Sequence, residues 1–246
     1  IRYDKFQKLN EFEDLIGCNV VFISVPTPFD CKLDKVDDSA ITETLSKLKN
    51  LNYRGIVLLK STVPPGTCEK YCMEFNLDIV FNPEFLREST SPYEDFENQQ
   101  IIVIGTKSVS SFQKIEMMYK KVLDKEAVYY HTTFNEAEMI KCAQNTMLAS
   151  RVALANIIFD ACAHVDIDYN LIKEIAFDKF DILGPHMVQV PGPDGERGFG
   201  GKCLPKDIRA FRSVFDSDLL NEIIIYNNSL RKDMHKFLKN YEGSQE

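Results

Sequence analysis

The first half of the chain alternates short apolar runs with segments whose apolar residues are spaced as in a helix. Uninterrupted apolar runs are typical of strands buried in a sheet. We expect five such strands, at residues 19–25, 56–60, 77–81, 101–105 and 127–130. Helical spacing predicts intervening helices over residues 36–51, about 67–75 and 109–123. Alternation of this kind predicts an α/β fold, with a mostly parallel sheet covered by helices on both faces.

The second half of the chain has the periodicity of helices only. One long helix is expected from residue 136 to about 165, where Ile140, Met147, Leu154 and Ala161 repeat every seven residues. Ala143, Ser150 and Ile157 lie beside this stripe, and its small residues would let another helix approach closely. We therefore expect the helix to be the seam of a homodimer. Shorter helices are predicted at residues 169–177, 207–215 and 219–238, and the long Gly- and Pro-rich loop at 184–206 indicates a functional segment.

Composition and charge exclude several classes of function. The chain has 246 residues, 44% hydrophobic and 27% charged, which is ordinary for a globular protein. The net charge is −8 and no Lys/Arg-rich stripe is present, so we expect no nucleic-acid partner. No uninterrupted apolar run approaches the roughly 18 residues of a membrane helix, so we expect no membrane span. Seven cysteines without a C-x-x-C pair argue against a disulfide framework or a metal site and for a cytoplasmic, reducing location.

Pro- and Thr-rich turns follow three of the predicted strands. They read PTP at residues 26–28, STVPPGT at 61–67 and NPE at 82–84. In parallel sheets, ligands bind beyond the carboxyl ends of the strands. These turns therefore mark the edge at which we expect a ligand.

The segment GFGGKCLPKD, residues 198–207, carries the strongest chemical signal. Glycines allow a backbone to approach a ligand closely, and Pro205 fits the first turn of a helix. Cys203 would then lie at a helix N-terminus near Lys206, and both lower the pKa of a thiol. Asp207 follows one helical turn later. A lone cysteine is usually a buried core residue, but the surrounding pattern favours a reactive thiol here.

Two further groups suit catalysis, although each also has a simpler explanation. Lys141 and Asn145 share one face of the long helix, and a cation beside an amide suits oxyanion stabilisation; a solvated lysine is the alternative. Glu84 and Glu88 follow a strand end and could divide binding and general-base work. An exposed helix start, where acids favour the helix dipole, is the alternative for this pair.

Taken together, these segments resemble the UDP-glucose and GDP-mannose dehydrogenase family. The similar segments are VPTP at 25–28, STVPPGT at 61–67, NPEFLRE at 82–88, Lys141 with Asn145, and PG at 191–192 through Asp207. They occur in the family's order, and the resemblance runs from about residue 3 to 230. It implies two successive NAD-dependent hydride transfers at C6 of a nucleotide sugar, most simply UDP-glucose.

The resemblance also implies roles for individual residues. Cys203 would attack the aldehyde formed first, so that the second oxidation gives a thioester. Lys141 and Asn145 would stabilise oxyanions, Asp207 with Thr62 would hold a water, and Glu88 would help to activate the hydrolytic water. The residues expected to bind the substrate are Glu84, Phe85, Leu86, Arg87, Gly198, Phe199 and Gly200. Those expected to bind the cofactor are Asp4, Pro26, Thr27, Ser61, Thr62 and Glu88.

Three departures from the family pattern are expected to matter. The chain has no G-x-G-x-x-G turn, and the resemblance implies that it starts inside the second strand, with Asp4 at the end of that strand. Roughly one βα unit of about 30 residues is then expected to be absent from this chain. We therefore expect this chain to bind NAD weakly or not at all. The family's C-terminal nucleotide-binding domain is also expected to be missing from this chain. The arginine that the family often places before the Gly-rich loop is Ile182 here, with Arg197 or His186 as possible substitutes.

The resemblance implies an incomplete Rossmann-like parallel sheet over residues 1–133 and an all-α dimerisation and substrate domain over 134–246. UDP-N-acetyl sugars and GDP-mannose remain alternative substrates. A degenerate homologue that binds a nucleotide sugar or a partner without turnover is a second interpretation. A β-hydroxyacid-type dehydrogenase, such as one acting on 6-phosphogluconate, ranks last because it would not need the Cys203 loop.

Overall fold

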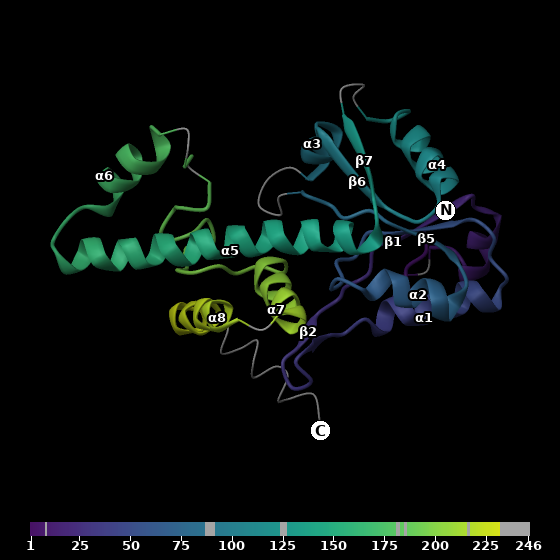
Figure 1. The fold of residues 1–246 in the computed structure, drawn as a ribbon, viewed down its shortest axis with the longest axis horizontal. Helices are drawn as coiled ribbons and strands as arrows, with labels where there is room; N and C mark the ends of the chain where they lie inside the picture. The colour runs from purple at the N-terminus through teal and green to yellow at the C-terminus, as the bar shows by residue number, and fades with distance from the viewer. Residues whose placement is uncertain are drawn as a thin grey trace. The chain divides into compact units, whose positions relative to one another are not determined.

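The computed structural model describes residues 1–7, 9–86, 92–123, 127–180, 183–184, 186–215 and 217–231. The chain forms two compact units. The first comprises Ile1–Pro28 and Val36–Lys141, and the second comprises Phe29–Lys35 and Cys142–Glu246. Figure 1 shows the elements of both units along the chain.

A five-stranded sheet forms the centre of the first unit, in the order β1-β4-β5-β6-β7. The strands are β1 (Val20–Ile23), β4 (Ile56–Leu59), β5 (Asp78–Phe81), β6 (Ile101–Gly105) and β7 (Val128–Thr132). All neighbouring pairs are parallel except β5 and β6, which are antiparallel and meet at Phe81 and Gly105. The five predicted strands and the mostly parallel, Rossmann-like sheet are confirmed.

Helices cover both faces of this sheet because side chains alternate along each strand. On β4, Val57 and Leu59 pack with the first helices, whereas Ile56 and Leu58 pack against the opposite layer. The first layer contains η1 (Phe12–Gly17), α1 (Ser39–Asn50) and α2 (Thr67–Phe75). The other layer contains α3 (Pro92–Glu97) and α4 (Val109–Tyr119). Helix α3 and η1 were not predicted from the sequence.

The expected strand end at residues 3–5 is not formed. Asp4 makes only an isolated bridge with Gln7, and its Oδ1 accepts the backbone N–H groups of Phe6 and Gln7 at 2.9 and 3.1 Å. A short polar side chain that binds the backbone two and three residues ahead favours a turn over a strand. The prediction of a second strand ending at Asp4 was therefore wrong for this structure.

In its described residues, the second unit combines helices with one strand of a short hairpin and a long loop before Cys203. It contains most of α5 (Phe134–His164), which begins in the first unit, followed by α6 (Tyr169–Lys173), the π-helix η2 (Glu174–Asp178), α7 (Leu204–Val214) and α8 (Asp218–Leu230). The predicted continuation of the last helix to residue 238 lies outside the described residues. Strand β2 (Phe29–Asp30) pairs with β3 (Lys35–Val36) in a two-stranded sheet that the sequence did not reveal. Arg212 on α7 pairs with Asp34, which ties this hairpin to the helical unit.

The seven-residue stripe of α5 is exposed. Ile140, Met147 and Leu154 of this stripe have 40, 65 and 57% of their surface accessible, and Ala161 is exposed as well. Ile157, beside the stripe, is 49% exposed. By length and composition α5 could also cross a membrane, a test that core helices of globular proteins pass as well. The inward side of the second unit packs differently, since Ala149 on α5 forms a core with Phe199, Ile208, Leu220 and Ile224.

Candidate active site

The turns after β1 and β4 are joined by the hydroxyl groups that were expected to face the cofactor. Ser61 Oγ accepts a hydrogen bond from Val25 N at 2.9 Å and donates one to Val25 O at 2.7 Å. Thr27 Oγ1 donates to Thr62 O at 2.9 Å. Thr27 and Ser61 are buried, whereas Pro26 is exposed. These contacts fix the backbone of the two turns at the carboxyl ends of adjacent parallel strands, which is where a dinucleotide binds in such sheets.

Glu138 holds the turn after β4 from the start of α5. Its carboxylate is fully buried and accepts the backbone N–H groups of Gly66 at 2.6 Å and Cys68 at 2.7 Å. A carboxylate at the N-terminus of α2 is stabilised by the unpaired N–H groups and the helix dipole. Burial nevertheless raises the pKa of Glu138, against the lowering effect of those N–H groups. Sequence reasoning missed this residue, although its place three residues before Lys141 was a usable signal.

A cluster of charged and polar side chains lies where β4 and β5 end. Lys60 Nζ donates to Asn82 Oδ1 at 2.8 Å, and Tyr119 OH donates to the same oxygen at 2.5 Å. Burial lowers the pKa of Lys60 to about 8; the Glu84 carboxylate opposes this shift and the Lys141 ammonium reinforces it. Lys60 was not among the predicted site residues, because a lysine next to a strand end usually looks solvated.

Lys141 is buried rather than solvated. It is 4% exposed, and its Nζ lies 5.4 Å from the centre of the Phe85 ring. Phe85 and Leu86 are half-buried, as is Glu84. The structure therefore brings Lys141 of the long helix together with Phe85 of the segment predicted to bind the substrate. The predicted residues Arg87 and Glu88 lie outside the described residues, as does Ile182.

Cys203 occupies the N-cap position of α7, as the sequence predicts. The helix begins at Leu204 with Pro205 in its first turn, and Asp207 N donates to Cys203 O at 2.8 Å. The thiol is half-buried. Gly201, two residues earlier, has a φ of +73°, a left-handed conformation that favours glycine. Cys203 therefore lies at the end of the helix whose unpaired backbone N–H groups carry partial positive charge.

Asp207 is the centre of a buried polar network in the second unit. Asn145 Nδ2 on α5 donates to its Oδ2, and Lys206 Nζ lies 2.8 Å from its Oδ1. Asp207 is fully buried and Asn145 is 5% exposed. A buried carboxylate needs such partners, because an unpaired buried charge is costly. The network links the helix that carries Asn145 to the helix that follows Cys203. A water held jointly by Asp207 and Thr62 stays a prediction.

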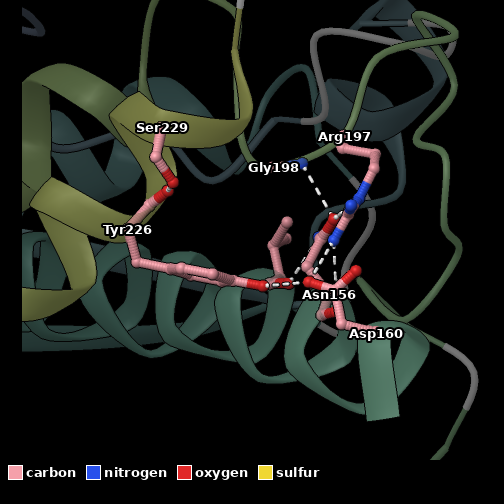
Figure 2. Close-up of polar contacts among 7 residues, drawn as sticks. Asn156, Asp160, Arg197, Gly198, Tyr226 and Ser229 are labelled. Atoms are coloured by element: carbon pink, nitrogen blue, oxygen red, sulfur yellow. Dashed lines mark hydrogen bonds and ion pairs between the residues drawn. The ribbon is translucent and has the colours of Figure 1, made fainter. Parts of the chain in front are cut away.

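The Gly-rich loop before Cys203 contacts α5 and α8. Phe199 is 2% exposed and forms part of the helical core, while Gly198 is buried and Gly200 half-buried. Arg197, a possible substitute for the family arginine, is held within its own unit: it pairs with Asp160 at 2.7 Å and donates to Asn156 Oδ1 at 3.2 Å (Figure 2). His186, the other possible substitute, is exposed.

The sheet is mostly parallel, its turns after β1 and β4 are joined at the carboxyl ends of the strands, and a helical unit follows. This architecture defines the class of dinucleotide-binding α/β proteins. Residues 3–123 match the model of the UDP-glucose/GDP-mannose dehydrogenase family, NAD binding domain, and residues 135–229 match the model of the central domain of the same family. The chain therefore belongs to the UDP-glucose/GDP-mannose dehydrogenase family, and NAD is the cofactor of its sheet domain.

Individual proteins show the same likeness. UDP-glucose 6-dehydrogenase of Rickettsia bellii is 33% identical over 233 residues, which cover 90% of this chain and 52% of that protein. The solved UDP-glucose dehydrogenase of the archaeon Pyrobaculum islandicum superimposes with a TM-score of 0.78 at 26% identity, over 96% of this chain and 56% of that one. The UDP-D-ManNAc dehydrogenase of Pyrococcus horikoshii has the same fold, with a TM-score of 0.79 at 24% identity over 94% and 55% of the two chains. The chain spans about half the length of these relatives.

Proposed function

We propose that this chain is part of an NAD-dependent dehydrogenase that oxidises UDP-glucose to UDP-glucuronate, with Cys203 as the covalent nucleophile. The observation that carries the proposal is the position of Cys203 at the N-cap of α7, one turn before the buried Asp207. A relative of the same family that is 33% identical bears the name UDP-glucose 6-dehydrogenase.

The residues present fit a cofactor at the sheet edge. The turns after β1 and β4 are held together there by Ser61 and Thr27. The role of Asp4 rests on the family resemblance alone, because its Oδ1 accepts the N–H groups of Phe6 and Gln7 in a turn outside the sheet. In this proposal Asp4 binds a ribose and the two turns carry the cofactor against the strand ends. NAD, when bound, accepts the hydride in each of the two oxidations.

Catalysis by this chain's residues follows from their chemistry. With Thr62, Asp207 holds a water that takes the proton of the C6 hydroxyl during the first oxidation. The Cys203 thiolate then attacks the aldehyde carbon, and the carbonyl oxygen becomes an oxyanion that Lys141 and Asn145 stabilise. The second oxidation leaves a thioester on Cys203. A water activated with the help of Glu88 attacks it, which releases the carboxylate and restores the thiol.

In this proposal two loops bind the substrate, one after β5 and one before Cys203. Glu84, Phe85, Leu86 and Arg87 would contact the sugar from the end of β5, and Gly198, Phe199 and Gly200 from the loop before Cys203. UDP-N-acetyl sugars and GDP-mannose are the alternative substrates. None of the seven cysteines forms a disulfide in the described part of the chain, which suits a reducing cytoplasm.

A homodimer along α5 is part of the proposal. The stripe of Ile140, Met147, Leu154 and Ala161 is exposed in the single chain, and small residues beside it would admit a second helix. A permanent seam of this kind buries more than roughly 2,000 Å².

The test of the proposed function uses the gene product that carries this sequence. NADH formation is measured with UDP-glucose, UDP-N-acetylglucosamine and GDP-mannose in parallel. The proposal predicts the highest kcat/KM with UDP-glucose. A higher value with another of these sugars would reassign the substrate, and no NADH with any of them would favour a binding protein without turnover.

A further inference from the structure

Two buried asparagines enclose the loop that leads to Cys203. Asn156 comes from α5 and Asn227 from α8, and each is only 1% exposed. Asn156 Oδ1 accepts the N–H of Gly198 at 3.2 Å, and Asn227 Oδ1 accepts the N–H of the next residue, Phe199, at 2.7 Å. Successive backbone amides of the loop are thus bound by side chains from two different helices.

Asn227 binds the loop with both ends of its amide. In addition to accepting from Phe199 N, its Nδ2 donates to Phe199 O at 3.0 Å. This reciprocal pair satisfies the backbone donor and the backbone acceptor of one buried residue, Phe199, which lies outside any strand or helix. Because an unpaired buried amide costs about 1–3 kcal/mol, the pair fixes the position of Phe199 relative to α8.

Two glycines of the loop are explained by the close approach of α8. A Cβ on Gly198 would lie 2.5 Å from Asn227 Oδ1, and Gly198 has a φ of +76°. A Cβ on Gly200 would overlap the guanidinium of Arg231, which also lies 2.9 Å from Asp194 Oδ2. The glycines therefore accommodate α8, whatever they also do for a ligand.

A second set of contacts joins the two helices next to the loop. Asp160 on α5 pairs with Arg197 at 2.7 Å and accepts from Tyr226 OH on α8 at 3.0 Å. Figure 2 shows Arg197 and Tyr226 meeting at Asp160, with Gly198 N directed at Asn156. Asn156 and Asn227 thus lie in a contact region between α5 and α8 that the bonds of Asp160 also hold together.

We propose that Asn227, together with Asn156, is a positioning residue that sets the place of the Cys203 thiol by clamping the backbone at Gly198 and Phe199. Only three residues separate Phe199 from Cys203, and the helix that follows is anchored through Asp207. The chain is therefore held on both sides of the sulfur. The catalytic consequence rests on the proposed function, whereas the clamp itself does not.

Hydrogen exchange and kinetics of three variants test the clamp. Asn227→Ala removes both hydrogen bonds, Asn227→Asp keeps the acceptor for Phe199 N but loses the donor, and Ser229→Ala is the control. Ser229 is exposed on the same helix, and its Oγ donates only to Tyr226 O at 2.7 Å among the bonds described. Far-UV circular dichroism confirms that each variant is folded.

The Asn227→Ala change should speed amide exchange at Phe199 and at residues 200–203 by roughly tenfold. Asn227→Asp should restore part of the protection, and Ser229→Ala should leave it unchanged. In the active gene product kcat should fall with KM for NAD unaltered. Unchanged exchange at 200–203, or an unchanged kcat, would overturn the proposal. If the wild type makes no NADH, the proposed function fails, and the exchange data alone decide whether the clamp exists.

Discussion

Replacing Gly198 by alanine should destabilise the helical unit more than the same change at Gly195. Both glycines have a left-handed backbone, with φ of +76° and +78°. They differ in their surroundings: a Cβ at Gly195 meets nothing within 4 Å, whereas at Gly198 it meets Asn227 Oδ1 at 2.5 Å. The pair therefore separates backbone strain from a steric collision.

The expected magnitudes follow from these two contributions. An L-residue in the left-handed region costs about 1–2 kcal/mol, and both variants carry that cost. The lower entropy of the unfolded alanine chain, about 0.4–1 kcal/mol, also applies to both and cancels in the comparison. At Gly198 the methyl group would also displace Asn227 from its two hydrogen bonds with Phe199, worth about 0.5–1.5 kcal/mol each. Gly198→Ala should therefore lower the free energy of unfolding by about 1–3 kcal/mol more than Gly195→Ala.

The measurement is urea unfolding of the 246-residue chain, followed by far-UV circular dichroism. Gly66→Ala serves as a second control, because Gly66 has a φ of +90° and open space around its Cβ but lies in the sheet unit. Its effect should appear only in unfolding of that unit. Equal destabilisation by Gly198→Ala and Gly195→Ala would refute the reasoning, since it would show that Asn227 does not restrict the loop.

Three other predictions concern the site and the α5 surface. Lys141→Ala should lower kcat by about 100-fold or more in steady-state assays of the gene product, because one oxyanion donor is worth about 3 kcal/mol; a change under threefold would contradict it. The pKa of Lys60 is lowered to about 8, so the folded state holds this proton less tightly than the unfolded state, and the contribution of this group to stability should rise as pH increases from about 8 to 10.5. Lys60→Met should remove that contribution, so the stability of the wild type relative to the variant in urea unfolding should be greater at the higher pH, while Tyr119 still donates to Asn82. Met147→Lys together with Leu154→Lys should convert a dimer into monomers, as measured by light scattering. A wild type that is monomeric at micromolar concentration would exclude the seam.

Local signals in the sequence predicted the sheet and the start of α7. The run at residues 101–105 coincides with β6, and Pro205 marked the first turn after Cys203. The β2–β3 hairpin was missed because two residues per strand give no periodicity. The antiparallel entry of β6 also leaves no local signal, since an apolar run reads the same in either direction.

The polar contacts of the site could not be predicted, because they join positions far apart in sequence. Glu138 binds a turn 70 residues earlier, and Asn227 binds a loop 28 residues earlier. In the sequence both look like ordinary polar residues of exposed helix faces. Gly198 and Gly200 were assigned to a ligand, but only the packed structure shows that α8 also requires them.

The most direct test of the central claim counts NADH formed per UDP-glucose by the wild-type gene product and by Cys203→Ser. The account predicts two equivalents of NADH per sugar for the wild type, with UDP-glucuronate as product. Cys203→Ser should give no net acid and at most one slow equivalent, because a serine hydroxyl is a weak nucleophile near neutral pH. Steady-state formation of acid by Cys203→Ser at the wild-type rate would remove Cys203 from the mechanism.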